Sequence, residues 1–285
     1  MERTSSQPSR GYLRDTASRA RDLPRSAVVV VLTLAIVLLP GIEAGAENRR
    51  IVEAPKDYGT LLEVAPGDSG HHVSVLQDRL AQAGFFTGHV TGTFDDHTGS
   101  AVVALHKLIG TDRTTTFGLL DWAALDGVLS WRIDDYGIPD RWDEPDRIEL
   151  DLTRQLMFLV RGGDVHAILP ISSGGSYSYW SERNQKVVRA GTPRGDFTLF
   201  RHDVGWRCEE ITGWCVQNYW AFHPFYGIHG YRSVPTYPAS HGCARVHTWD
   251  SEWLEGQLEL GMPVHIWDDM PEVEGPPAPP SSIRF

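Results

Sequence analysis

Two short segments near the C-terminal end of the chain bring together residues that can carry out covalent acyl transfer. They are Ile228-His229-Gly230 and, ten residues after Gly230, Ser240-His241-Gly242-Cys243-Ala244-Arg245. A thiol attacks a carbonyl well only after losing its proton, and an imidazole within reach can take that proton to give a thiolate–imidazolium pair. The segments therefore predict a cysteine nucleophile, Cys243, with a histidine as its base.

The order of these residues resembles the signature of the L,D-transpeptidases of bacterial cell walls, whose catalytic domain is YkuD-like. That signature runs histidine-glycine, a short spacer, serine-histidine-glycine-cysteine, one residue, and arginine or asparagine. Thr192-Pro193-Arg194-Gly195-Asp196-Phe197 and Ser172-Ser173-Gly174 resemble two further motifs of the family. The resemblance extends over about residues 148–267.

The resemblance implies that Cys243 forms a thioester with a peptidoglycan stem peptide and that His229 is the base, its ring oriented by the backbone near Gly230. His241 is the competing base. It lies two residues from Cys243, so in extended backbone it projects to the same side and does not easily pair in line with the thiol. We expect His229 to be the base and His241 to line the pocket or support the donors around the substrate carbonyl.

Backbone and side-chain groups beside the nucleophile are expected to complete the site. The Ser240 hydroxyl is expected to brace the turn. Gly242 lacks a side chain, so its N–H and that of Cys243 can point at a developing oxyanion. Arg245 can grip a carboxylate with two hydrogen bonds or orient the loop, and a surface ion pair of little energetic value is the alternative.

An aromatic run precedes His229 and spans residues 219–226. We expect Trp220 and Phe222 to pack in the core. Tyr219 and Tyr226 are better candidates to wall the substrate cleft.

A metal site is the alternative chemistry for these residues. His229, His241, Cys243 and His247 could bind zinc in an open tetrahedral arrangement. Their spacing fits no common ligand pattern, and the glycine before Cys243 suits an oxyanion pocket better. We therefore expect no metal and no other cofactor.

Residues 1–46 are predicted to direct export. An arginine-rich segment precedes the apolar stretch from Ala27 to Leu39, and Ala44-Gly45-Ala46 supplies small residues for cleavage before Glu47. The apolar stretch is shorter than the ~20 residues of a bilayer-spanning helix, which favours a cleaved signal peptide over an uncleaved signal anchor. Either would place the remaining chain outside the membrane, in the cell wall or a periplasm-like space, with membrane contact only through the anchor.

Export bears on the three cysteines. Cys208 and Cys215 lie seven residues apart and can form a disulfide in an oxidising compartment. Cys243 then remains as a free, reactive thiol. The alternative is that all three are reduced and buried.

Residues 68–126 are predicted to form a small all-α domain of three helices. Val73, Leu76 and Leu80 mark one face of the first helix, and the second and third are expected from about residue 98 to 110 and over 119–125. The region resembles the three-helix peptidoglycan-binding module found beside wall enzymes, which implies glycan as a partner. A helical spacer without a ligand is the alternative.

Residues 148–268 are predicted to form a mainly β catalytic domain. Polar and apolar residues alternate from Ile148, which predicts half-buried strands in an antiparallel β-sandwich or barrel with a peripheral helix over 248–260. The resemblance implies that this is the L,D-transpeptidase-like β-sandwich. Linkers are expected over 47–67 and 127–147, and a disordered proline-rich tail over 269–285.

The net charge of −11 argues against a nucleic-acid partner. The residues and the resemblance together favour an exported L,D-transpeptidase that forms 3→3 cross-links in peptidoglycan, with carbapenems as covalent inhibitors. With water as the acceptor it would be an L,D-carboxypeptidase. The remaining alternative is a non-catalytic cell-wall-binding protein.

Overall fold

The computed structural model describes residues 63–211 and 213–268 of the 285-residue chain. The predicted signal segment 1–46, the linker up to residue 62 and the tail 269–285 lie outside the described residues. All described residues belong to one compact unit, Ala54–Phe285. Within the two described ranges, no helix has the length and apolar character of a bilayer-crossing segment.

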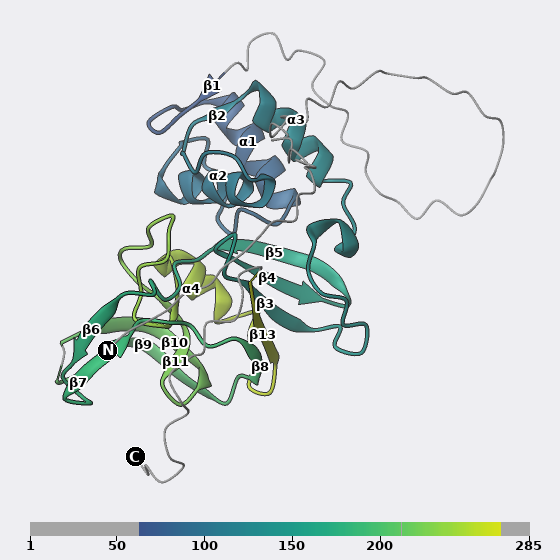
Figure 1. Ribbon diagram of the computed structural model, residues 1–285. Helices are drawn as coiled ribbons and strands as arrows, with labels where there is room; N and C mark the ends of the chain where they lie inside the picture. The colour runs from purple at the N-terminus through teal and green to yellow at the C-terminus, as the bar shows by residue number, and fades with distance from the viewer. Residues whose placement is uncertain (1–62, 212, 269–285) are drawn as a thin grey trace, which may run out of the picture. The chain divides into compact units, whose positions relative to one another are not determined.

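Three helices form the N-terminal part of this unit (Figure 1). They are α1 His71–Gln82, α2 Asp96–Ile109 and α3 Leu119–Val128, accompanied by the paired strands β1 Glu63–Val64 and β2 Phe117–Gly118. Asp95 caps α2 by accepting the backbone N–H of Thr98, and Gly110 ends it in the left-handed conformation at φ 73°. α1 buries the apolar positions that its periodicity assigned to one face.

Two β-sheets form the rest of the unit. One has the strand order β5-β4-β3-β13-β8 and the other β12-β11-β10-β9, with a separate hairpin, β6-β7. The strands are β3 Arg147–Asp151, β4 Leu156–Arg161, β5 Asp164–Pro170, β6 Ser178–Ser181, β7 Lys186–Arg189, β8 Gly195–Thr198, β9 Arg201–Cys208, β10 Cys215–His223, β11 Tyr226–Gly230, β12 Ala244–Val246 and β13 Pro263–Trp267. Met157, Phe222 and Ile228 belong to one core cluster that draws on both sheets. The prediction of a mainly β catalytic region is confirmed.

Two strand pairs are parallel, which differs from the antiparallel prediction. β11 pairs with β12, and β3 pairs with β13. Other segments separate the members of each pair along the chain, so no tight hairpin forces them to run in opposite directions. The alternation of apolar residues reveals a strand but not the direction of its neighbour.

The peripheral helix is shorter than predicted. α4 spans Thr248–Leu254, whereas the sequence pattern suggested a helix to residue 260. Gly256, a poor helix former, lies in the part that does not continue the helix, and the chain turns there while still burying Leu258.

The helices and the sheets share a core, and the segment 127–147, predicted as a linker, packs against it. Within that segment a 3₁₀ helix, η2 Ile133–Tyr136, forms, and Tyr136 and Ile138 are buried. The apolar side chains of β4 serve two cores: Phe158 packs with the helices, and Met157 with the sandwich. A strand buried on both faces reads as a continuous apolar run, which β4 shows, rather than as the half-buried strand predicted.

Candidate active site

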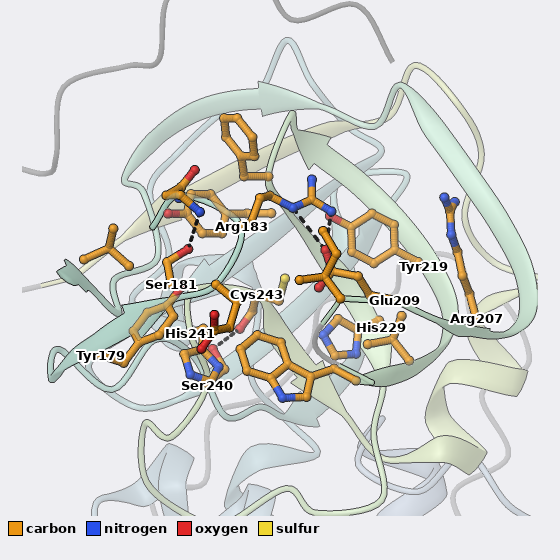
Figure 2. A pocket seen from close by; sticks show the side chains of 18 of the residues that line it. Tyr179, Ser181, Arg183, Arg207, Glu209, Tyr219, His229, Ser240, His241 and Cys243 are labelled. Atoms are coloured by element: carbon orange, nitrogen blue, oxygen red, sulfur yellow. Dashed lines mark hydrogen bonds and ion pairs between the residues drawn. The ribbon is translucent and has the colours of Figure 1, made fainter. Parts of the chain in front are cut away.

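A cleft of about 1140 Å³ opens beside the four-stranded sheet, and the predicted catalytic residues line it. Figure 2 shows the Cys243 sulfur and the His229 ring within this cleft, with Tyr219, Ser240 and His241 around them. Tyr226 and Arg245 also belong to its lining.

Strand register explains why Cys243 and His229 share one face. In the parallel pair of β11 and β12, Ile228 lies opposite Ala244, and His229 lies opposite Arg245. Ile228 and Ala244 are fully buried in the core between the sheets. Because successive side chains of a strand point to opposite faces, His229 and Arg245 point away from that core, as does Cys243, which directly precedes Ala244. The cleft is therefore built on the outer face of this strand pair.

The His229 ring is held in one tautomer. Its Nδ1 lies 3.1 Å from the carbonyl oxygen of Gly230. A carbonyl can only accept, so Nδ1 carries the proton and Nε2 keeps the free lone pair. Burial lowers the pKa of His229 to about 4. The nearby Arg245 charge lowers it as well, whereas the hydrogen bond to Gly230 raises it. The imidazole is thus a neutral base at neutral pH.

The Cys243 thiol is free and half-buried. Burial raises its pKa, opposed by the Gly227 backbone N–H, the Arg245 charge and the Tyr219 hydroxyl, which favour the thiolate. Since burial also lowers the pKa of His229, burial disfavours the charged form of both groups in the free protein. This differs from the expected thiolate–imidazolium pair, because a buried site penalises both charges.

The turn before the nucleophile is closed by Ser240. Its Oγ accepts the Gly242 N–H at 3.0 Å and donates to the Cys243 carbonyl oxygen at 2.6 Å. The N–H of Gly242 is therefore already donated within the turn, which corrects the expectation that it points at an oxyanion. Gly242 has φ 144°, and a Cβ there would lie 2.2 Å from a ring carbon of Tyr226. The glycine is needed for its conformation and for the close approach of Tyr226.

The other two sequence motifs meet at this turn. Thr192 Oγ1 donates to the Gly242 carbonyl oxygen at 2.8 Å and accepts the Gly174 N–H at 2.9 Å. Ser172 and Arg245 exchange backbone hydrogen bonds at 3.0 and 3.1 Å. Segments far apart in the sequence thus hold the backbone on both sides of Cys243.

Arg245 lies in the cleft with its guanidinium 4.3 Å from the ring centre of Tyr231. Throughout residues 63–211 and 213–268, no carboxylate lies within ion-pair distance of it. The surface ion pair, which was the alternative role for Arg245, is therefore not formed by the described residues. Its positive charge instead favours the thiolate of Cys243 and disfavours protonation of His229.

His241 sits in an aromatic wall of the cleft. Its ring stacks on Trp214 at 4.2 Å and contacts Tyr179 edge-on at 4.0 Å. Sequence reasoning missed Trp214 and Tyr179, and it missed the backbone N–H of Gly227 beside the sulfur. The only signal for Trp214 is its place next to Cys215.

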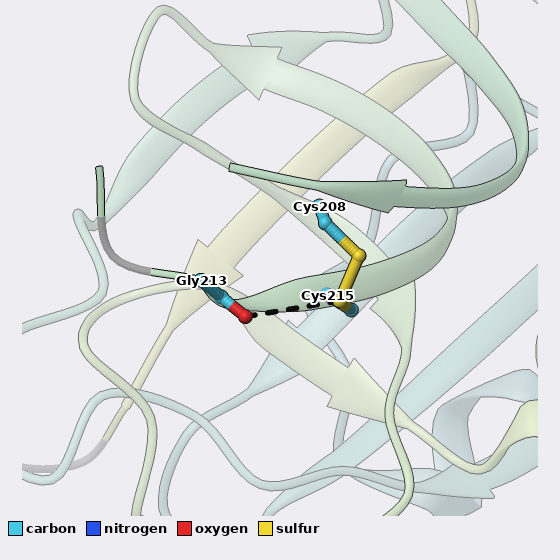
Figure 3. Close-up of a disulfide and its surroundings, with 3 residues drawn as sticks. All are labelled: Cys208, Gly213 and Cys215. Atoms are coloured by element: carbon cyan, nitrogen blue, oxygen red, sulfur yellow. Dashed lines mark hydrogen bonds between the residues drawn. A yellow bond between two sulfur atoms is a disulfide. The ribbon is translucent and has the colours of Figure 1, made fainter. Parts of the chain in front are cut away.

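Cys208 and Cys215 form a disulfide (Figure 3). They are cross-strand partners at the ends of β9 and β10. Trp214 lies between the two cysteines, directly before Cys215, so the disulfide constrains the loop that carries this wall of the cleft.

His247, the fourth residue of the zinc alternative, is not among the residues that line the cleft. Its ring stacks on Trp249 at 4.4 Å, and it lines a second, smaller pocket. The described part of the chain holds no group of three or more histidine, cysteine, aspartate or glutamate side chains arranged to bind a metal ion.

A solved L,D-transpeptidase structure shares this architecture. The family model of the L,D-transpeptidase catalytic domain, YkuD, matches residues 145–266. The crystal structure of an L,D-transpeptidase from Xylanimonas cellulosilytica DSM 15894 is 31% identical, with a TM-score of 0.65, over 72% of this chain and 98% of that chain. The L,D-transpeptidase (Yku) from Stackebrandtia nassauensis is 19% identical, with a TM-score of 0.42, over 72% of this chain and 94% of that one. A search of the curated proteins gave no match.

Proposed function

The chain belongs to the L,D-transpeptidase family, and on this premise we propose that it cross-links peptidoglycan stem peptides by 3→3 bonds through a thioester on Cys243. The observation that carries the proposal is the shared face of β11 and β12. It places a free thiol, a neutral imidazole and a guanidinium in one cleft. A thiol with a base beside it is the arrangement that covalent acyl transfer requires, and the guanidinium adds a positive charge that can bind a carboxylate.

In the first half-reaction, Cys243 Sγ attacks the carbonyl carbon that joins the third stem residue to the terminal D-alanine of a tetrapeptide. The thiol proton passes to His229 Nε2 as the sulfur–carbon bond forms, because burial disfavours the charged form of both groups beforehand. The imidazolium then protonates the leaving amine, the carbon–nitrogen bond breaks, and D-alanine departs. A thioester of the shortened stem remains on Cys243.

In the second half-reaction, the side-chain amine of a diamino acid in another stem attacks the thioester. The amine gives a proton to His229 Nε2, the carbon–sulfur bond breaks, and the proton returns to the sulfur. The products are a cross-linked pair of stems and the free thiol. Water in place of the amine would release a tripeptide, which is the carboxypeptidase reaction.

Two groups near the sulfur are placed to assist. The Tyr219 hydroxyl and the Gly227 N–H lower the pKa of the Cys243 thiol, against the burial that raises it, and so favour its negative form. Arg245 has no carboxylate partner among the described residues, so we assign to it a carboxylate of the stem peptide. Tyr219 and Tyr226 form the walls against which the peptide would lie.

The disulfide supports the further proposal that this chain works outside the cytoplasm, in the cell wall or a periplasm-like space, because such bonds persist in oxidising compartments. Deletion of residues 1–46 should then leave the protein inside the cell, with Cys208 and Cys215 reduced. Export and oxidation of the shortened chain would contradict this. Glycan binding by residues 68–126 stays a prediction.

The test is incubation of the purified protein with a defined tetrapeptide stem, followed by mass analysis. We expect a dimer that has lost one D-alanine, and no product with Cys243→Ala. Tripeptide without dimer would identify a carboxypeptidase. Unchanged tetrapeptide, together with no carbapenem adduct on the protein, would favour the non-catalytic wall-binding protein.

A further inference from the structure

A buried lysine from the helices hydrogen-bonds two backbone carbonyl groups of the β-sheet region. Lys107, on α2, is 3% exposed, and its Nζ donates to the carbonyl oxygens of Gln155 and Ile171, both at 3.0 Å. Burial, aided by the Arg113 charge, lowers the pKa of this amine to about 7. Protonated or neutral, the amine has an N–H for each carbonyl. Lysine is almost never fully buried without a partner, because burying its amine costs free energy. The two carbonyl oxygens are the partners that offset this cost.

The side chain of Gln155 continues the hydrogen-bond path towards the cleft. It is 1% exposed and adopts φ 61°, a left-handed conformation that is uncommon for a residue with a side chain. Its Oε1 accepts the Ser173 N–H at 2.8 Å, and its Nε2 donates to Ser173 Oγ at 2.7 Å. The side chain thus holds Ser173 at two atoms.

Ser173 in turn holds the segment that carries the nucleophile. Its carbonyl oxygen accepts the N–H groups of Ala239 and Ser240, both at 2.9 Å. Ser240 Oγ then bonds the Gly242 N–H and the Cys243 carbonyl oxygen. An unbroken path of hydrogen bonds, buried except for the last one, therefore runs from α2 to Cys243.

A second contact from the helices reaches the same loop. Arg113, which follows α2, donates to the carbonyl oxygen of Thr236. Thr236 lies between His229 and Ser240, in the connection between the two catalytic segments, and Ser172 Oγ donates to the carbonyl oxygen of the next residue, Tyr237, at 2.8 Å. The helical region therefore contacts the connection between the two catalytic segments at Thr236, in addition to the backbone carbonyls that Lys107 binds.

We propose that Lys107 is a positioning residue for Cys243, acting through Gln155, Ser173 and Ser240, so that the three-helix region is a working part of the catalytic unit. The proposal rests on the acyl transfer at Cys243 proposed above. Displacement of a reacting atom by about 1 Å can slow a reaction by roughly 10²-fold, so loosening this path should slow acylation without removing any group that touches the substrate.

The first measurement is hydrogen exchange in the full chain, which needs no activity. In Lys107→Met, the Ala239 and Ser240 amides should exchange at least about tenfold faster, because their acceptor, Ser173, is no longer fixed. The Ile168 amide, which donates to Gly84 at the same junction of helices and sheet, is the internal control and should keep its protection. Gln155→Leu breaks the path from the other side and should give the same pattern.

The second measurement is the rate of carbapenem acylation of Cys243. Lys107→Met should be at least about tenfold slower than the wild type. Arg79→Met is the matched control, since it breaks the Arg79–Asp126 ion pair within the helices but leaves the path intact. In the double variant of Lys107→Met and Gln155→Leu, the two effects should not add, because both substitutions interrupt one path.

The outcomes separate this proposal from the function it rests on. A wild type that forms no adduct contradicts the proposed function. A wild type that is acylated, with Lys107→Met equally fast, overturns the positioning role alone. Additive effects in the double variant, or a loss of protection that spreads equally to Ile168, would also overturn it, because they indicate general destabilisation.

Discussion

At Asp250, the effect of burial on the ionisation of a carboxyl group can be measured as a pH-dependent change in the free energy of unfolding. It lies on α4 and is 2% exposed. Its Oδ1 accepts a hydrogen bond from Thr87 Oγ1 at 2.8 Å, whereas its Oδ2 has no hydrogen-bond partner among the described residues. Burial raises the pKa of this carboxyl from its ordinary 3.8 to about 7. Because the folded-state pKa lies above the unfolded one, this group's contribution to stability is complete below about pH 4 and is lost as the pH rises to about 7.

Asp250→Asn removes this ionisation and keeps an oxygen for Thr87. Each pH unit inside the window changes the free energy of unfolding of the wild type by about 1.4 kcal/mol. From pH 5 to pH 8 the free energy of unfolding of the variant should therefore rise by about 2–3 kcal/mol relative to that of the wild type. The difference already present at pH 5 is the effect of the amide itself and is subtracted. Urea unfolding of both proteins at pH 5, 6, 7 and 8 gives the comparison.

The matched control is Asp140→Asn, the same chemical change at an exposed position of the chain. It makes this change where water surrounds the side chain in both states, so it reports the effect of the substitution without burial. A difference between Asp250→Asn and the wild type that stays constant from pH 5 to pH 8 would refute the reasoning.

Three further predictions concern the cleft. Carbapenem acylation should be constant from pH 7 to about 5 and fall near pH 4, because the neutral form of His229 is needed and burial lowers its pKa to about 4; a fall near pH 6.5 would contradict this. Tyr219→Phe, which removes a hydroxyl that favours the thiolate of Cys243, should slow acylation by roughly 10–10²-fold with an unchanged urea midpoint, and an unchanged rate would exclude that role. Gly242→Ala should slow acylation and lower Tm, since its Cβ would meet Tyr226; Tyr226→Ala in the same chain should restore part of the Tm, and no recovery would argue against the clash.

The core of the site could be predicted from the sequence because its residues lie in two short segments with fixed spacing. Glycines and a cysteine–histidine set in that order restrict the chemistry strongly. The sequence also showed the three helices, since apolar periodicity and a glycine at the end of α2 are local signals. Such local signals describe each segment separately and not how the segments pack together.

Contacts between distant segments could not be predicted in the same way. Nothing local distinguishes Lys107 from a solvated lysine, because its acceptors, Gln155 and Ile171, lie on other elements. The parallel pairing of β11 with β12 depends on the intervening connection. The Gly242 N–H was assigned to an oxyanion because the sequence does not show that the Ser240 hydroxyl reaches it first.

The joining of helices and sheets into one core was missed for a related reason. The composition of residues 127–147, rich in aspartate and proline, suggested a linker. In the structure this segment buries Tyr136 and Ile138, and β4 is covered on both faces. Length and polarity of a connection do not reveal whether it packs against its neighbours.

The most direct measurement is the mass of the peptide that contains Cys243, taken after the protein meets a tetrapeptide stem without an acceptor and the reaction is quenched in acid. We expect this residue to carry the stem shortened by D-alanine, and the adduct to form at least about 10²-fold more slowly in His229→Asn. An adduct on any other residue, or one that forms at the same rate without the imidazole, would contradict acyl transfer by this thiol and its neighbouring base.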